Sequence, residues 1–198
     1  MNPAPRLSNR IHPNREFACP ACQKVIGICD RCPHCRFTGA DTMAMFPGPP
    51  PRWQPVMDGG QVWDDSELKL IERARQPLDR RFPQFRWCIC SVNLPPDHNL
   101  RLFGFWLHNA SPLTAGETLT DRTWTVLLVV NATTAATAVV PGYAAEVWLN
   151  VAQWEQALAS MKAPWHAGRP GKAVAAFLNT AGTLLETSWR TLAADSRD

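Results

Sequence analysis

The sequence lacks several features that would point directly to a common activity. Its 198 residues contain no Gly-rich phosphate loop, no Gly-x-Ser-x-Gly elbow and no His-Glu-x-x-His motif, so the usual signatures of nucleotide-binding proteins, α/β-hydrolases and zinc proteases are missing. No apolar run approaches the roughly twenty residues that a membrane helix needs, and no signal-peptide core follows MNPAPRLSNR. We therefore expect a cytoplasmic protein without membrane insertion, and we assign no catalytic residue.

What the sequence does contain is two Cys-Pro-x-Cys turns near its start. Cys19 and Cys22 belong to the turn CPAC, Cys32 and Cys35 belong to the turn CPHC, and the short loop QKVIGICDR separates the turns. Each turn can present two thiolates on one side, and two such turns complete the tetrahedral four-sulfur shell of a structural zinc site. A closed shell leaves no position for a substrate. The sequence therefore predicts a zinc-ribbon-like module that holds a structural Zn²⁺.

Cys29 leaves the choice of ligands open, because it forms a further Cys-x-x-Cys with Cys32. We favour the two pairs that share the proline, which makes Cys29 a spare thiol and His34 a turn residue. The alternatives are a redox dithiol, plain buried cysteines and a rubredoxin-type iron site. Gln23 and Arg36 stand where a glycine usually follows such turns, and this departure disfavours iron more than zinc.

Cysteine number and charge indicate the compartment and one class of partner. Seven cysteines are an odd number with metal-like spacing, which favours a reducing compartment over a disulfide framework. The formal net charge is only +3, but the start of the chain is basic, with Arg6, Arg10, Arg15, Lys24, Arg31 and Arg36 against Glu16 and Asp30. This suggests nucleic acid as a partner, although four thiolates on one Zn²⁺ cancel about half of that excess charge.

The chain divides into three parts. Residues 1–45 form the basic zinc module, residues 46–55 (FPGPPPRWQP) form a Pro-rich linker with an extended conformation, and residues 56–194 form a larger domain. Periodicity and turn residues predict helices at 64–74, 100–110, 143–161 and 170–192, and strands at 86–94, 124–130 and 134–140, the last two as a hairpin. Pro77 should end or kink the first helix, and 164–171 should separate the last two. This order indicates an α/β or α+β layer structure.

The strand at 86–94 has the pattern of a central strand. Cys88, Cys90 and Val92 lie on one face, and Trp87 and Ile89 lie on the other, so both faces are expected to be buried. We interpret the two cysteines as small core residues.

The segment from Val56 to Leu192 resembles the TPM domain family, which includes the thylakoid lumen acid phosphatase. The resemblance depends on the order of several motifs: VMDGG, RWCICSVNL, LFGFWLHNAS, DRTWTVLLVVN, VPGYAAE and HAGRPGKAVAAFL. It implies a compact α/β fold with a central mixed sheet flanked by helices. Members of the family are associated with phosphatase activity, divalent-cation binding and accessory roles in assembling or repairing membrane complexes.

The resemblance also implies an acidic site. Asp58, Asp121 and Glu146 match acidic positions of the family, and together they would suit Ca²⁺ or Mg²⁺, which bind several oxygen ligands. The chain departs from the family pattern at Arg122 and Thr123, which replace Asn-Gly, at Ala144, which replaces a glycine, and at Asn131, which replaces an Asp. Each change lowers charge or flexibility and weakens a divalent site. The alternative is that Asp58 and Asp121 cap turns and Glu146 begins a helix.

Other polar and aromatic residues suggest sites of interaction. His108, followed by Asn109, is the best candidate for a further polar site residue, with a capping or structural role as the alternative. Trp53, Trp63 and Trp165 lie beside linker or turn residues, where they either line an exposed binding face or pack the zinc module onto the larger domain.

The sequence thus predicts an intracellular zinc-binding, TPM-like protein that acts as a protein-interaction or accessory module with an unidentified protein partner. A weak divalent-cation-dependent acid phosphatase is the first alternative. Binding of nucleic acid through the basic module is the second.

Overall fold

A four-stranded mixed sheet organises the fold. The structure is a computed structural model that describes residues 17–27 and 29–195. The strands lie side by side in the order β3 (Val56–Asp58), β4 (Arg86–Val92), β5 (Thr125–Asn131) and β6 (Thr137–Pro141). β3, β4 and β5 are parallel, and β6 returns antiparallel to β5. The predicted α/β fold with a central mixed sheet is confirmed, as is the hairpin, whereas β3 lies in VMDGG, where no strand was expected.

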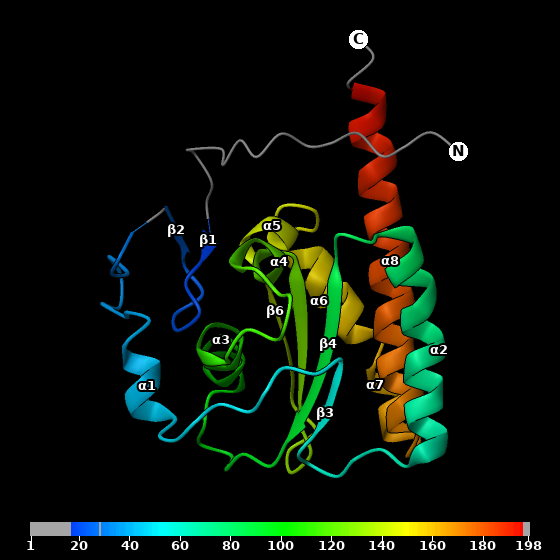
Figure 1. Cartoon of the computed structure of the whole chain (residues 1–198), viewed down its shortest axis with the longest axis horizontal. Helices are drawn as coiled ribbons and strands as arrows, with labels where there is room; N and C mark the ends of the chain where they lie inside the picture. Colours follow the sequence, from blue (N-terminus) through cyan, green and yellow to red (C-terminus); the bar gives the residue numbers. More distant parts are fainter. Residues whose placement is uncertain (1–16, 28, 196–198) are drawn as a thin grey trace.

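The core lies on both faces of the sheet. Cys88 and Cys90 belong to one apolar cluster, and Trp87 and Ile89 belong to a second cluster on the opposite face, as the alternation predicted. Helices cover both faces (Figure 1): α3 (Leu100–Ala110) covers the first, and α2 (Asp65–Arg81), α6 (Val151–Ala159) and α8 (Pro170–Asp195) cover the second. The one-turn helix α4 (Leu119–Thr123) precedes β5.

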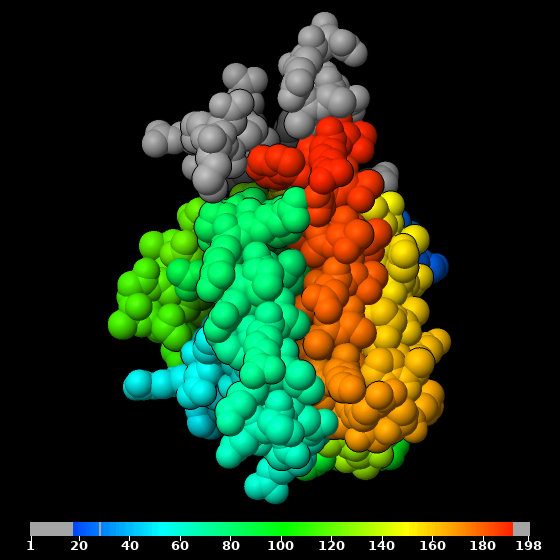
Figure 2. Space-filling view, turned by 90° about the vertical axis from the view of Figure 1, so that its right-hand side faces the viewer, coloured from blue at the N-terminus to red at the C-terminus, as the bar shows by residue number. Residues whose placement is uncertain are grey.

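Helices α2 and α8 lie side by side along the second face (Figure 2). α2 continues through Pro77 to Arg81, so Pro77 does not end the helix as expected. Leu78 is buried, and its carbonyl accepts a hydrogen bond from the Phe82 N–H at 2.8 Å. Packing of α2 against α8 therefore outweighs the loss of the one backbone hydrogen bond that proline removes.

The prediction of a single helix at 143–161 was wrong, because this segment contains two helices, α5 (Tyr143–Glu146) and α6, and a third, α7 (Lys162–His166), follows it. A new helix begins at Asn150, whose side chain accepts a hydrogen bond from the Gln153 N–H at 2.9 Å. The Gln153 side chain accepts one from the Asn150 N–H, also at 2.9 Å. This capping box separates α6 from α5.

A small module of short elements lies on the α3 side of the sheet (Figure 1). It contains β1 (Phe17–Ala18), which pairs antiparallel with β2 (Val25–Ile26), and α1 (Asp41–Met45). The segment 46–55 that follows has no helix or strand, and its Phe46 and Trp53 are buried in the apolar cluster around α3. The division of the chain into three parts stays a prediction.

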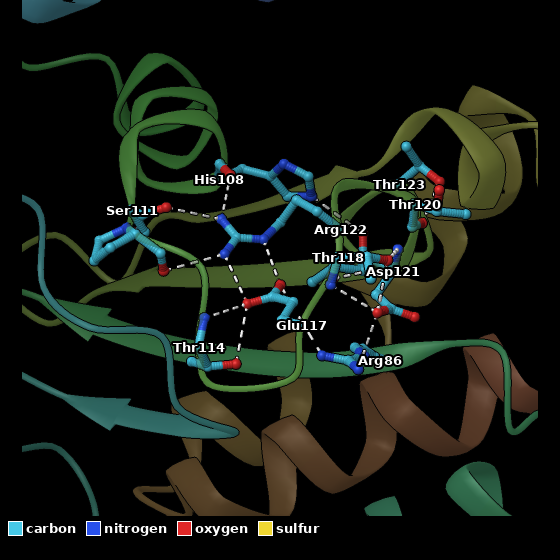
Figure 3. Close-up of polar contacts among 12 residues, drawn as sticks. Arg86, His108, Ser111, Thr114, Glu117, Thr118, Thr120, Asp121, Arg122 and Thr123 are labelled. Carbon is cyan, nitrogen blue, oxygen red and sulfur yellow. Dashed lines mark hydrogen bonds and ion pairs between the residues drawn. The ribbon is translucent and has the colours of Figure 1, made fainter.

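A buried ion pair of Arg122 and Glu117, both in the segment before β5, lies against the end of α3 (Figure 3). Arg122 donates hydrogen bonds to both carboxylate oxygens of Glu117, at 2.7 and 3.0 Å. It also donates to the carbonyl oxygens of His108 and Ser111, at 2.9 and 3.2 Å. The Trp53 ring lies over the guanidinium, with its centroid 4.6 Å from the central carbon. These contacts compensate for the burial of two charges and hold the end of α3 in place.

His108 is a structural member of this cluster. Its Nε2 lies 3.4 Å from the carbonyl oxygen of Thr125 in β5, and its ring meets the Trp53 ring edge to face. Burial lowers the pKa of His108 to about 4, so the imidazole is neutral at pH 7. Asn109 is exposed, and its amide donates to the Phe105 carbonyl one turn earlier at 2.8 Å. His108 therefore has a structural role, which was the alternative to a role as a polar site residue.

We predict that the ion pair of Glu117 contributes stability that acid removes. Burial alone would raise the pKa of Glu117, but hydrogen bonds from Arg122 and Thr114 outweigh it and lower the pKa from 4.5 to about 2. A lowered folded-state pKa contributes stability that is complete above pH 4.5 and is lost as the pH falls toward 2, by about 3 kcal/mol. Glu117→Gln should lower the free energy of unfolding at pH 7 by about 3 kcal/mol and reduce its loss in acid, as measured by urea denaturation.

Glu155→Gln is the control for this experiment, because it removes an exposed carboxylate from α6. If the Glu117 variant lost as much stability between neutral and acid pH as the parent protein, the assignment would be contradicted.

We also predict that Gly171 is required by the close approach of α8 to α2. The Gly171 N–H donates to Glu67 Oε1 at 3.2 Å, and a Cβ atom at Gly171 would lie 2.6 Å from Glu67 Cβ and 2.9 Å from its Cα. Gly171→Ala should therefore lower the free energy of unfolding by about 1–3 kcal/mol. Gly27→Ala, where no atom lies within 4 Å of the added Cβ, should leave it nearly unchanged. Thermal denaturation of both variants measures the difference, and equal midpoints would contradict the prediction.

Candidate metal centre

The two Cys-Pro-x-Cys turns have the same backbone hydrogen bonds. In the first turn, the Gln23 N–H donates to the Cys19 carbonyl at 2.8 Å; in the second, the Arg36 N–H donates to the Cys32 carbonyl at 2.9 Å. Each turn is closed by a return bond, from the Cys19 N–H to the Lys24 carbonyl and from the Cys32 N–H to the Phe37 carbonyl. The repeated pattern gives both turns one geometry, so each directs two sulfur atoms to the same side.

The four sulfur atoms of Cys19, Cys22, Cys32 and Cys35 lie within 4.8 Å of one another. The Sγ atoms of Cys19 and Cys35 are 3.7 Å apart, and those of Cys22 and Cys32 are 3.8 Å apart, so each of these contacts joins one turn to the other. Among the residues that the structure describes, no other group of three or more His, Cys, Asp or Glu side chains is this close. The four cysteines are therefore positioned to bind a metal ion.

The donor set and its dimensions fit a tetrahedral ion. Four sulfurs at about 2.3 Å from a central Zn²⁺ lie about 3.8 Å from each other, which agrees with the 3.7 and 3.8 Å of the two contacts between the turns. A four-sulfur tetrahedron also suits iron, so the dimensions do not identify the metal.

The residues that follow each turn adopt an unusual backbone conformation. Gln23 has φ of 60° and Arg36 has φ of 64°, both in the left-handed region that favours glycine. The missing glycines noted in the sequence therefore do not change the turn. They make it less favourable, by about 1 kcal/mol per residue.

Burial and ionisation differ among the four thiols. Cys19 and Cys32 are buried, Cys22 is half-buried and Cys35 is exposed. Burial opposes ionisation of Cys32, but backbone N–H groups of Cys35 and His34 lower its pKa to about 6. The Phe37 N–H favours the thiolate of Cys35, yet partial desolvation of its sulfur and the three neighbouring sulfurs outweigh it and raise the pKa of Cys35 to about 12. One sulfur is thus easily ionised, whereas several thiolates together need a cation between them.

The remaining thiols of the chain do not join the cluster. Cys29 is exposed and lies outside the four-sulfur group, and His34, in the second turn, is also exposed. Cys88 and Cys90 are buried in β4, and burial raises the pKa of each thiol to about 12. Of the basic residues noted at the start of the chain, Arg6, Arg10 and Arg15 lie outside the described residues.

Asp58 lies at the carboxyl end of β3 and organises a turn. Its carboxylate accepts hydrogen bonds from the N–H groups of Val62 and Trp63, at 2.9 and 3.1 Å, and from the Ser91 hydroxyl. Asp58 therefore caps a turn, which was the alternative to a role in a cation site.

Asp121 and Glu146 lie at the opposite end of the sheet. Asp121 accepts the Thr118 N–H at 2.8 Å in the capping box of α4 and lies 3.7 Å from an Arg86 guanidinium nitrogen (Figure 3), and Glu146 is in α5, after β6. Asp58 pairs with Ser91, and the five residues from Ser91 to Arg86 along β4 span about 16 Å. The structure does not bring the three carboxylates into one cluster.

The tryptophans proposed for an exposed face are mostly internal. Trp53 and Trp63 are buried in the two core clusters, and Trp165 is partly buried against the second cluster. Trp53 and Trp63 therefore pack and do not line a binding surface. The sequence analysis missed Phe37 and Phe46, which pack against α3. Phe37 lies two residues after Cys35, and Phe46 directly follows α1.

Comparisons with known proteins support the fold and leave the family open. No protein-family model matches the sequence, and no curated protein matches it either. Within the described residues, no helix is long and apolar enough to cross a membrane. Among solved structures, the chain is similar to the N-terminal domain of a protein from P. gingivalis, determined by solution NMR, with a TM-score of 0.52 and 12% sequence identity over 78% of this chain and 94% of that one. This similarity shows a shared fold, and the TPM family is not confirmed.

Proposed function

We propose that the chain is an intracellular protein-interaction or accessory module whose Cys19, Cys22, Cys32 and Cys35 hold one structural Zn²⁺ ion. The closed group of four sulfur atoms supports this proposal. All four positions of a tetrahedral ion are taken by side chains of the chain, so no position is left for a substrate or a reactive water. The metal then stabilises a surface and takes no part in chemistry.

Zinc fits this site better than a redox dithiol does. A dithiol pair reacts within one Cys-x-x-Cys turn, whereas here sulfur contacts of 3.7 and 3.8 Å join the two turns, from Cys19 to Cys35 and from Cys22 to Cys32. All four side chains converge on one point, which is the arrangement that a single ion requires. Zinc also needs no redox partner to remain in place.

Apolar surface supports an interaction role for the larger domain. Four large apolar side chains are at least 45% exposed in α4, in α5 and directly after it, and at the start of α6, namely Leu119, Tyr143, Val147 and Val151. α4 and α5 are in contact at one end of the sheet. Exposed apolar residues gathered on neighbouring elements are typical of protein contacts. Because the three carboxylates of the phosphatase alternative are divided between two ends of the sheet, we do not propose that activity.

We predict that purified protein contains about one zinc ion per chain. Elemental analysis of the native protein measures the metal, and an iron site of the rubredoxin type would show visible absorption instead. Cys32→Ser should abolish stoichiometric binding because it removes a ligand from the closed shell. Cys29→Ser is the matched control and should retain the ion, since Cys29 lies outside the group. A native preparation that holds no metal would exclude the proposal.

We predict that the exposed apolar residues at this end of the sheet bind a protein partner and do not take part in hydrolysis. Leu119→Ser should weaken cross-linking of the chain to a partner in cells, because Leu119 is 75% exposed and its loss leaves the core intact. Val25→Ser, on exposed β2, is the control. Two results together would contradict this prediction. The protein would hydrolyse p-nitrophenyl phosphate in a cation-dependent way that Asp121→Asn or Glu146→Gln abolishes, and the Leu119 variant would show unchanged cross-linking.

A further inference from the structure

The cysteine module has little apolar core of its own. In the described residues 18–27 and 29–45, the buried side chains are those of Cys19, Cys32 and Thr42. β1 and β2 have two residues each, and α1 has five residues and no side-chain hydrogen bond at its N-cap. Elements this short are unstable alone, so the module depends on its metal for internal structure.

The module lies against the outer face of α3. The ring of Phe37, two residues after Cys35, meets the Phe105 ring edge to face at 5.8 Å between centroids. Ala21 of the first turn is also packed against the apolar cluster of α3, and α1 contacts α3. Both cysteine turns are thus coupled to the helix that covers this side of the sheet.

The contact between module and helix is thin. A hollow of about 500 Å³ lies within the module, between α1 and the cysteine turns, and a second hollow of about 220 Å³ lies between α1 and α3, at the contact itself. Phe105, Trp106 and Ala110 of α3 line the second hollow. An interface with unfilled space loses dispersion contacts, and this lowers the free energy needed to open it.

The apolar clusters of the larger domain include few side chains of the module. Every buried residue of the cluster beneath α2 and α8 lies after residue 55. On the α3 side, Phe46 packs against Phe103 and Trp106, at 5.4 and 5.5 Å between ring centroids, and Trp53 lies over Arg122. These two anchors hold the chain that leaves α1, so separation of the module would end at Phe46.

We propose that metal occupancy controls access to the apolar face of α3. With metal bound, residues 17–45 cover the face that includes Phe105, Trp106 and Ala110. Loss of the metal unfolds this cover and exposes the face, while the sheet and its helices stay folded. The proposal rests on the metal site described above and assigns it a regulatory role.

The test compares the full-length protein with and without its metal. After removal by a chelator, trypsin should cleave after Arg36 at least about tenfold faster, because cleavage follows the population of the open state. The fluorescence of anilinonaphthalene sulfonate, which binds exposed apolar surface, should rise, and the far-UV circular dichroism should remain largely unchanged. Added Zn²⁺ should reverse all three effects.

Two variants separate the cover from the metal site. Phe37→Ala removes the contact with Phe105 but none of the four cysteines, so it should bind the dye and be cleaved faster while it still holds one metal ion. Val25→Ala is the control, because Val25 belongs to the same module and is 57% exposed. It should behave as the parent protein does.

The outcomes distinguish this inference from the proposed function. If the native protein contains metal but its cleavage and dye binding are the same after chelation, the proposal that the module covers α3 is contradicted, and the proposed zinc site is not. Loss of the whole circular dichroism signal on chelation also contradicts the proposed cover, because the module would then be part of the main core. Absence of any metal from the native protein overturns both proposals.

Discussion

The parallel pairing of β4 with β5 is the constraint on which the rest of the structure depends. Seven consecutive pairs, from Arg86 with Thr125 to Val92 with Asn131, join the two strands, and every residue of β5 is buried. Strands that are buried on both faces need helices on both sides, and this requirement produces two separate apolar clusters. The cysteine module packs against only one of them, through α3. The module can therefore add a metal-dependent surface without carrying the stability of the sheet.

The pairing of the strands also explains why the sequence could not show whether the three carboxylates lie close together. Asp58 is level with Ser91 at one end of β4, and Asp121 contacts Arg86 at the other end. The relative direction of β3 and β4 is set by the connection through α2, which is a non-local property. Residues that match a family pattern one by one were therefore separated by the length of a strand.

Features that depend on neighbouring residues were predictable, and features that depend on tertiary packing were not. The alternation of β4, the hairpin and the convergence of the two cysteine turns all follow from local spacing. The capping box at Asn150 and Gln153 is equally local, but the sequence analysis missed it and predicted one helix across it. The buried pair of Arg122 and Glu117 was not predictable, since charged residues in a short polar segment are usually exposed. Passage of α2 through Pro77 likewise depends on α8.

The two left-handed residues connect the local geometry of the metal centre to its energetics. Gln23 and Arg36 have positive φ without being glycine, which costs about 1 kcal/mol each. In the described residues 18–27 and 29–45, three buried side chains give the module little apolar burial to offset this cost. In small zinc-binding peptides, binding of a structural Zn²⁺ contributes about 10–16 kcal/mol. Substitution of the usual glycines therefore shifts the folding of the module further onto the metal. Because Phe37 follows Arg36 directly, the contact with α3 depends on the same turn that a metal bound by the four cysteines would stabilise.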